Sequence, residues 1–79
     1  MRVLREIQHS DCRITIFSWN NRYIIKVEQG LLEQTFKVHE YDVAGDEDIL
    51  KLIDETFIKQ TLDRFVNMDA SLSEALKRS

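Results

Sequence analysis

The fold follows from one stretch of sequence, residues 12–28, which reads CRITIFSWNNRYIIKVE. Two runs rich in β-branched and aromatic residues flank the pair Asn20-Asn21, and asparagine tolerates the positive φ angles of a two-residue type I′ turn. Such a turn places apolar residues opposite apolar ones and Arg13 opposite Glu28, so the stretch predicts an antiparallel hairpin. The other expected pairs are Ile14–Val27, Ile16–Ile25, Phe17–Ile24, Ser18–Tyr23 and Trp19–Arg22.

The flanking residues extend this hairpin to a four-stranded antiparallel meander with strands at about 2–7, 12–19, 22–28 and 32–40. A second two-residue turn at Gln29-Gly30 sets Val27 opposite Leu32, Lys26 opposite Glu33, Ile24 opposite Thr35 and Tyr23 opposite Phe36. In the first strand, we expect the pairs Ile7–Cys12, Glu6–Arg13 and Val3–Ile16. In this register Gln34 lies opposite Ile25 on the apolar core face, where a polar side chain is not expected. The apolar residues of this face are Val3, Ile7, Ile14, Ile16, Tyr23, Ile25, Val27, Leu32, Phe36 and Val38.

The second half of the chain has helical patterning. Asp46 is a suitable N-cap for a short helix over 46–54, and Glu47 and Asp48 add negative charge near its start. Two apolar stripes point about 150° apart, so we expect a break near 54–56 and a second, longer helix. The first stripe is Ile49, Leu50, Ile53 and Phe57, and the second is Ile58, Leu62, Phe65 and Val66. The chain is therefore expected to be one α+β domain, residues 1–79, with both helices packed on one face of the sheet.

The second helix is too long for the sheet. From about Glu55 to Lys77 it would measure roughly 35 Å, whereas strands of eight residues measure about 26 Å. Residues 69–79, which include Leu72 and Leu76, are therefore expected either to fray or to contact a partner, and a second copy of the chain is the simplest partner. The motif Ser71-Leu72-Ser73-Glu74 also matches a capping box, so a new short helix starting there is an alternative.

Length and composition exclude several protein classes. The chain has 79 residues, a net charge of −3, two glycines, no proline and a single cysteine. One thiol cannot form an intrachain disulfide, which favours a cytoplasmic protein. No apolar run approaches the roughly 20 residues of a membrane-spanning helix, and the first residues lack the apolar block of a signal peptide. We expect a protein that does not interact with membranes.

Catalytic and metal-binding patterns are weak, and we expect neither an enzyme nor a cofactor. His9, Asp11 and Cys12 lie in one turn, but with His39 they fall short of the ligand set of structural zinc, so turn formation and packing explain them better. A Cys12–His9 nucleophile pair would have no orienting third residue. The segment 39–42 is an ordinary polar strand end. The acidic residues Asp42, Asp46, Glu47 and Asp48 lack calcium-loop spacing, and no Gly-rich phosphate loop is present.

The second face of the sheet is the other unexplained feature. In the expected register it carries Leu4, Phe17, Trp19 and Ile24 among charged residues, a composition typical of an interaction site. Trp19 beside Arg22 also suits cation–π stacking. Alternatively, the helix at 46–54 or the tail at 69–79 folds over this face and buries it. The predicted interaction residues are Phe17, Trp19, Arg22, Ile24, Lys26, Leu72 and Leu76.

Three functional classes remain. The first is a non-enzymatic interaction module that forms a homodimer through the Phe17/Trp19/Ile24 face or through the C-terminal helix. The second is a binder of single-stranded nucleic acid on the aromatic and basic sheet face, which the net charge of −3 disfavours. The third is a small-ligand carrier or small enzyme with a site near Tyr23, Phe36, Tyr41 and His39, although so small a core leaves little room for a cavity.

Overall fold

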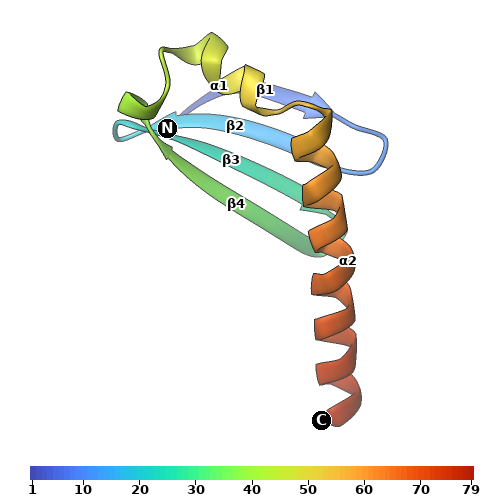
Figure 1. Cartoon of the computed structure of the whole chain (residues 1–79). Coiled ribbons are helices and arrows are strands. Elements are labelled where there is room, and N and C mark those ends of the chain that lie inside the picture. Colours follow the sequence, from blue (N-terminus) through green and yellow to red (C-terminus); the bar gives the residue numbers. More distant parts are fainter.

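The chain folds as an α+β domain, as predicted. The computed structural model covers residues 1–79 and contains one four-stranded antiparallel sheet in the order β1-β2-β3-β4, followed by helices (Figure 1). The strands are β1 (Arg2–Gln8), β2 (Arg13–Trp19), β3 (Arg22–Gln29) and β4 (Leu32–His39). A 3₁₀ turn, Glu40–Asp42, leads to α1 (Asp46–Leu52) and to the long α2 (Glu55–Arg78).

The central hairpin has the predicted register along its whole length. All pairs from Arg13–Glu28 to Trp19–Arg22 are formed between β2 and β3. Asn20 and Asn21 have φ angles of 52° and 63°, the left-handed values that a type I′ turn requires. The turn and the facing side chains thus fix the same alignment.

The predicted register between β3 and β4 is wrong by two residues. Strand β3 continues to Gln29, which pairs with Leu32, so the turn is formed by Gly30 and Leu31. Gly30 takes φ 60° at the first turn position, which glycine does without strain. Because the shift is two residues, every side chain keeps its face. Gln34 therefore still lies on the helix-bearing face, opposite Val27 instead of Ile25.

The predicted register of β1 is also wrong. Ile7 pairs with Ile14 and Glu6 with Thr15, whereas Val3 pairs with Phe17 after an irregularity between Val3 and Arg5. This β-bulge at Leu4 reverses the faces of the residues before it. Leu4 packs against the core together with Ile7, and Val3 is 52% exposed on the opposite face. The bulge allows two apolar residues three positions apart to reach the same core.

The core lies between one face of the sheet and the two helices. Its sheet residues include Ile14, Ile16, Ile25 and Val27, which are all at most 1% exposed. α1 contributes Ile49 and α2 contributes Phe65, both fully buried. Both helices therefore pack on the same face, as predicted.

The helix break is confirmed, but the predicted N-cap of α1 is wrong. Gly45 occupies the N-cap position with φ 157°, and Asp48 Oδ2 accepts a hydrogen bond from the Ala44 amide at 3.0 Å. The Asp46 carboxylate turns instead to the sheet, where its Oδ1 accepts a hydrogen bond from Tyr23 Oη at 2.7 Å. α2 begins after Asp54, whose Oδ1 accepts from the Phe57 amide at 2.8 Å.

α2 is one continuous helix from Glu55 to Arg78, so the alternative of a new helix starting at Ser71 is not realised. The first half of α2 crosses the sheet, whereas its second half projects beyond the end of the sheet (Figure 1). The longest dimension of the molecule is consequently 45 Å.

Candidate interaction surfaces

The contact between α2 and β4 fixes the direction in which α2 projects. Gln34 Nε2 donates a hydrogen bond to the Thr61 carbonyl oxygen at 2.8 Å, and Gln34 Oε1 accepts one from Arg64 Nε at 2.9 Å. The rings of Phe36 and Phe57 lie 5.1 Å apart, and the Arg64 guanidinium lies 5.7 Å from the centre of the Phe36 ring. Gln34 is thus a polar docking contact for α2 on the core face of the sheet.

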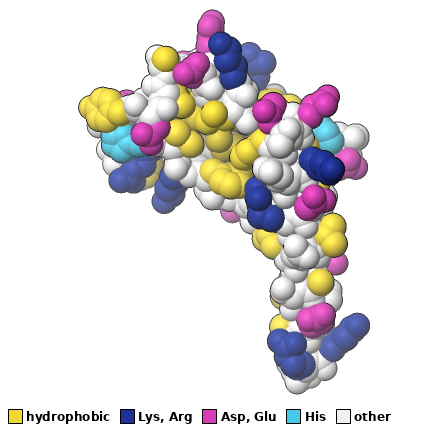
Figure 2. All heavy atoms as spheres, in the orientation of Figure 1, with side chains coloured by type: hydrophobic (Ala, Val, Ile, Leu, Met, Phe, Trp, Pro, Cys, Tyr) yellow, Lys and Arg dark blue, Asp and Glu magenta, His cyan; other side chains and the backbone are white.

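An apolar stripe runs along α2 from the core to the free end. Phe65, Met68, Leu72 and Leu76 recur at spacings of three and four, which places them on one side of the helix. Phe65 is fully buried and Met68 is half-buried, whereas Leu72 is 49% and Leu76 is 64% exposed. Apolar side chains are also visible along the projecting half in Figure 2, with cationic ones near its tip. The stripe that anchors α2 therefore continues into solvent.

Shallow hollows lie where α2 leaves the sheet. One is lined by Leu32, Arg64, Asn67, Met68, Ser71 and Leu72. A second lies beside it against the β3–β4 turn and shares Leu32 and Leu72. Leu31, at the tip of that turn, is fully exposed, and the sequence did not predict it as a surface residue of interest. The hollows, the turn tip and the stripe form one apolar surface at this end of the sheet.

The opposite face of the sheet is not covered by a helix. Phe17 and Ile24 are half-buried there, and Trp19 is 47% exposed. Val3, which faces Phe17, joins them because of the bulge, and no pattern in the sequence predicted it. Arg22 pairs with Trp19, as expected, and Lys37 lies opposite Ile24. The apolar end of this face therefore has a cationic border.

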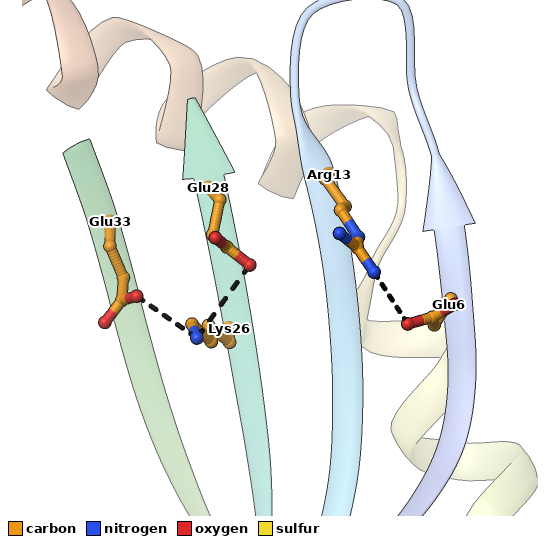
Figure 3. A network of polar contacts seen from close by, with 5 residues as sticks. All are labelled: Glu6, Arg13, Lys26, Glu28 and Glu33. Carbon is orange, nitrogen blue, oxygen red and sulfur yellow. Dashed lines mark hydrogen bonds and ion pairs between the residues drawn. The ribbon is translucent and has the colours of Figure 1, made fainter. Parts of the chain in front are cut away.

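The other end of the same face carries a network of ion pairs (Figure 3). Arg13 Nη2 lies 2.9 Å from Glu6 Oε1, and Lys26 Nζ lies 3.3 Å from Glu33 Oε2 and 3.9 Å from Glu28 Oε1. Lys26, a predicted interaction residue, thus belongs to this network and is paired with two carboxylates. The acidic residues of the face lie at the end away from Trp19.

The side chains considered above for catalysis or metal binding lie in turns, where their hydrogen bonds stabilise the backbone. His9 Nδ1 accepts a hydrogen bond from the Asp11 amide at 3.1 Å, and the His9 amide donates to the Cys12 carbonyl oxygen at 3.0 Å. Burial, with a contribution from the charge of Asp11, raises the pKa of the Cys12 thiol. His39 Nδ1 accepts from the Tyr41 amide at 3.3 Å and caps the 3₁₀ turn.

No three His, Cys, Asp or Glu side chains come together as metal ligands would. The hydrogen bond to Asp46, followed by desolvation, raises the pKa of Tyr23. None of the surface hollows is lined by the residues predicted for a small-ligand site, Tyr23, Phe36, Tyr41 and His39.

Neither helix combines the length and the apolar character that a membrane span requires. Comparisons with protein-family models, curated proteins and solved structures found no match to the chain.

Proposed function

We propose that this chain is a non-enzymatic, cytoplasmic interaction module that forms a homodimer through the projecting half of α2. The observation that carries the proposal is the continuity of the apolar stripe: Phe65 is buried in the core, and Leu72 and Leu76 extend the same side of the helix into solvent. The buried, unpaired thiol of Cys12 supports a reducing compartment.

The exposed fractions of Leu72 and Leu76 allow an estimate of the free energy of dimerisation. Burying a leucine side chain completely contributes roughly 1.5–3 kcal/mol. About half of Leu72 and nearly two-thirds of Leu76 remain to be buried, so both copies together gain about 5 kcal/mol before the cost of association. Met68 and Leu31 add to this gain. Even before the cost of association is subtracted, about 5 kcal/mol corresponds to a dissociation constant of about 0.2 mM, so the expected dimer is weak, in the high-micromolar to millimolar range.

The experiment is light scattering coupled to size exclusion, over concentrations up to about 1 mM, which spans this range. The wild-type chain should shift from monomer to dimer, and Leu76→Asp should remain monomeric. Ala70→Asp is the matched control, because it adds the same charge at an exposed position on the other side of α2.

Circular dichroism should show that both variants are folded, since Leu76 is 64% exposed and lies outside the core. A wild-type chain that is monomeric at all concentrations contradicts the proposal. Equal dissociation of both variants contradicts it as well. Trp19→Glu should leave the dimer intact, and a monomeric Trp19→Glu would transfer the contact to the open sheet face.

The open sheet face favours a second candidate, a binder of single-stranded nucleic acid. Trp19 is half exposed beside Arg22, and the acidic residues of this face are neutralised at its far end by Arg13 and Lys26. Base stacking on an aromatic residue next to a cation would use this arrangement. The net charge of −3 acts against it.

A thymidine oligonucleotide should then quench Trp19 fluorescence at low salt, with weaker quenching as salt is added or in Arg22→Gln. Unchanged fluorescence at low salt would exclude this second candidate.

A further inference from the structure

We infer that the two copies pair their α2 helices antiparallel, with Leu72 at the two-fold axis and Leu76 of each copy against Met68 of the other. This inference rests on the proposed homodimer and specifies its geometry. Four features of the chain lead to it: the position of the sheet, the alignment of the stripe, the hollow beside Met68 and the distribution of charge along α2.

The sheet excludes a parallel pair. The stripe of α2 faces the sheet along its first half, where Phe65 is buried against the core strands. In a parallel pair that uses this stripe, the first half of the partner helix would occupy the volume of the sheet. In an antiparallel pair the partner helix lies only along the projecting half and ends where the sheet begins. The two sheets then lie at opposite ends of a two-helix bundle, because the sheet of each copy covers only the first half of its own α2 (Figure 1).

The spacing of the stripe selects the alignment. With Leu72 on the axis, residues equally far before and after it face each other, so Met68 meets the partner's Leu76 and Leu72 meets its own copy. Each copy then contributes three apolar residues to a continuous seam. An alignment centred on residue 74 pairs Leu72 with Leu76 but leaves Met68 without a partner.

The same alignment fills the hollow at the end of the sheet. Met68 and Leu72 line this hollow together with Leu32. A leucine presented opposite Met68 enters it, so the side chain of Leu76 from the second copy becomes buried between α2 and the end of β4. The hollow is thus accounted for by a residue of the chain itself.

Charge along the projecting half also favours the antiparallel pair. Asp69 lies near the start of this half, and Lys77 and Arg78 lie at its end. In the antiparallel alignment Asp69 lies opposite residue 75, about 3 Å along the axis from Lys77 of the partner and on the same flank. A parallel pair would bring the cationic ends of both helices together, which is repulsive.

Disulfide cross-linking tests the alignment, since a bond forms only between Cβ atoms about 3.5–4.5 Å apart. The background is Cys12→Ala, which removes the native thiol. Leu72→Cys should form a covalent dimer under mild oxidation on the order of tenfold faster than the control Ala70→Cys. Leu76→Cys alone should not, whereas a mixture of Met68→Cys and a tagged Leu76→Cys chain should form the mixed dimer.

Light scattering on each reduced variant tests the homodimer separately from the antiparallel alignment. A non-covalent dimer in which Leu76→Cys cross-links to itself as fast as Leu72→Cys overturns the antiparallel alignment and leaves the homodimer standing. Cross-linking of Leu76→Cys to Lys37→Cys would instead place the projecting half on the open sheet face of the other copy, and it overturns the alignment too. Absence of any dimer overturns both the homodimer and the alignment.

Discussion

Replacing Gln34 by methionine tests how α2 is held to the sheet. The substitution keeps the length of the side chain and removes both of its hydrogen bonds, the one donated to the Thr61 carbonyl oxygen and the one accepted from Arg64. The first is partly buried and stabilises by about 1 kcal/mol, and the exposed Arg64 contact adds about 0.5 kcal/mol or less. We therefore expect a loss of about 1–1.5 kcal/mol, partly offset by burial of the methionine.

Urea unfolding followed by circular dichroism measures this loss. It should be carried out in the Leu76→Asp background, because a dimer would add a concentration-dependent contribution to the free energy of unfolding. For a domain of this size, 1 kcal/mol corresponds to a fall in Tm of roughly 4–8 °C. Gln60→Met on the exposed side of α2 is the matched control and should change stability by less than about 0.5 kcal/mol.

A double-mutant cycle with Arg64→Met isolates the side-chain pair. The coupling energy between the two positions should be about 0.5 kcal/mol, since Arg64 keeps its contacts to Thr61 Oγ1 and to the ring of Phe36 in the Gln34 variant. If Gln34→Met is as stable as the parent, apolar packing alone positions α2, and the reasoning is refuted.

Three further changes test other parts of the fold. Phe65→Ala removes a fully buried ring and should lower the free energy of unfolding by roughly 3–5 kcal/mol, a large part of the roughly 4–12 kcal/mol expected for a domain of this size. A variant that unfolds cooperatively in urea with a free energy of unfolding within about 1 kcal/mol of the wild type would contradict the central place of this residue in the core. Asn21→Ala, at φ 63°, should lose about 1–2 kcal/mol whereas Asn21→Gly should not, and equal stability of the two variants in urea would show that the turn is not strained. The raised pKa values of Cys12 and Tyr23 mean that the folded state favours the neutral forms of both groups, so their contribution to the free energy of unfolding is fully present below pH 9 and is lost as the pH rises through the folded-state values, above pH 9 for Cys12 and above pH 10 for Tyr23. Urea unfolding at several alkaline pH values measures this loss. Cys12→Ala should weaken its earlier part, and a free energy of unfolding that does not change with pH would contradict the expectation.

The central hairpin was predictable because two independent constraints agree on it. The Asn20-Asn21 turn fixes the loop, and the facing residues on both sides of the ladder match only in that alignment. The turn before β4 lacked the second constraint. A shift of two residues keeps every side chain on its face, so apolar patterning does not distinguish a turn at Gln29-Gly30 from one at Gly30-Leu31.

The bulge in β1 could not be recognised from alternation. Leu4 and Ile7 are three residues apart, a spacing that a regular strand places on opposite faces, and only the packed structure shows both against the core. The projecting helix, in contrast, followed from length alone. A helix at 1.5 Å per residue outruns strands of seven or eight residues whatever the details of packing, which is why Leu72 and Leu76 were predicted to extend past the sheet.

The two uncovered apolar surfaces differ in how far the chain itself shields them. On the open sheet face Thr15 is only 5% exposed although no helix lies over it. Its partners across the sheet, Glu6 and Lys26, have long side chains that belong to the same group of charged residues as Arg13 and Glu33. The charges on those side chains are paired with one another, so this end of the face is complete without a partner.

The projecting half of α2 has no such shield. On a helix the neighbouring side chains are three and four positions away; these include Ala75 for Leu72 and Ser73 for Leu76, whose short side chains cannot cover the two leucines. An isolated helical segment of this length is also marginal in water unless packing supports it. The same contact that buries Leu72 and Leu76 would stabilise the helix that presents them, and this double gain is the physical reason for assigning the dimer to α2 in preference to the open sheet face.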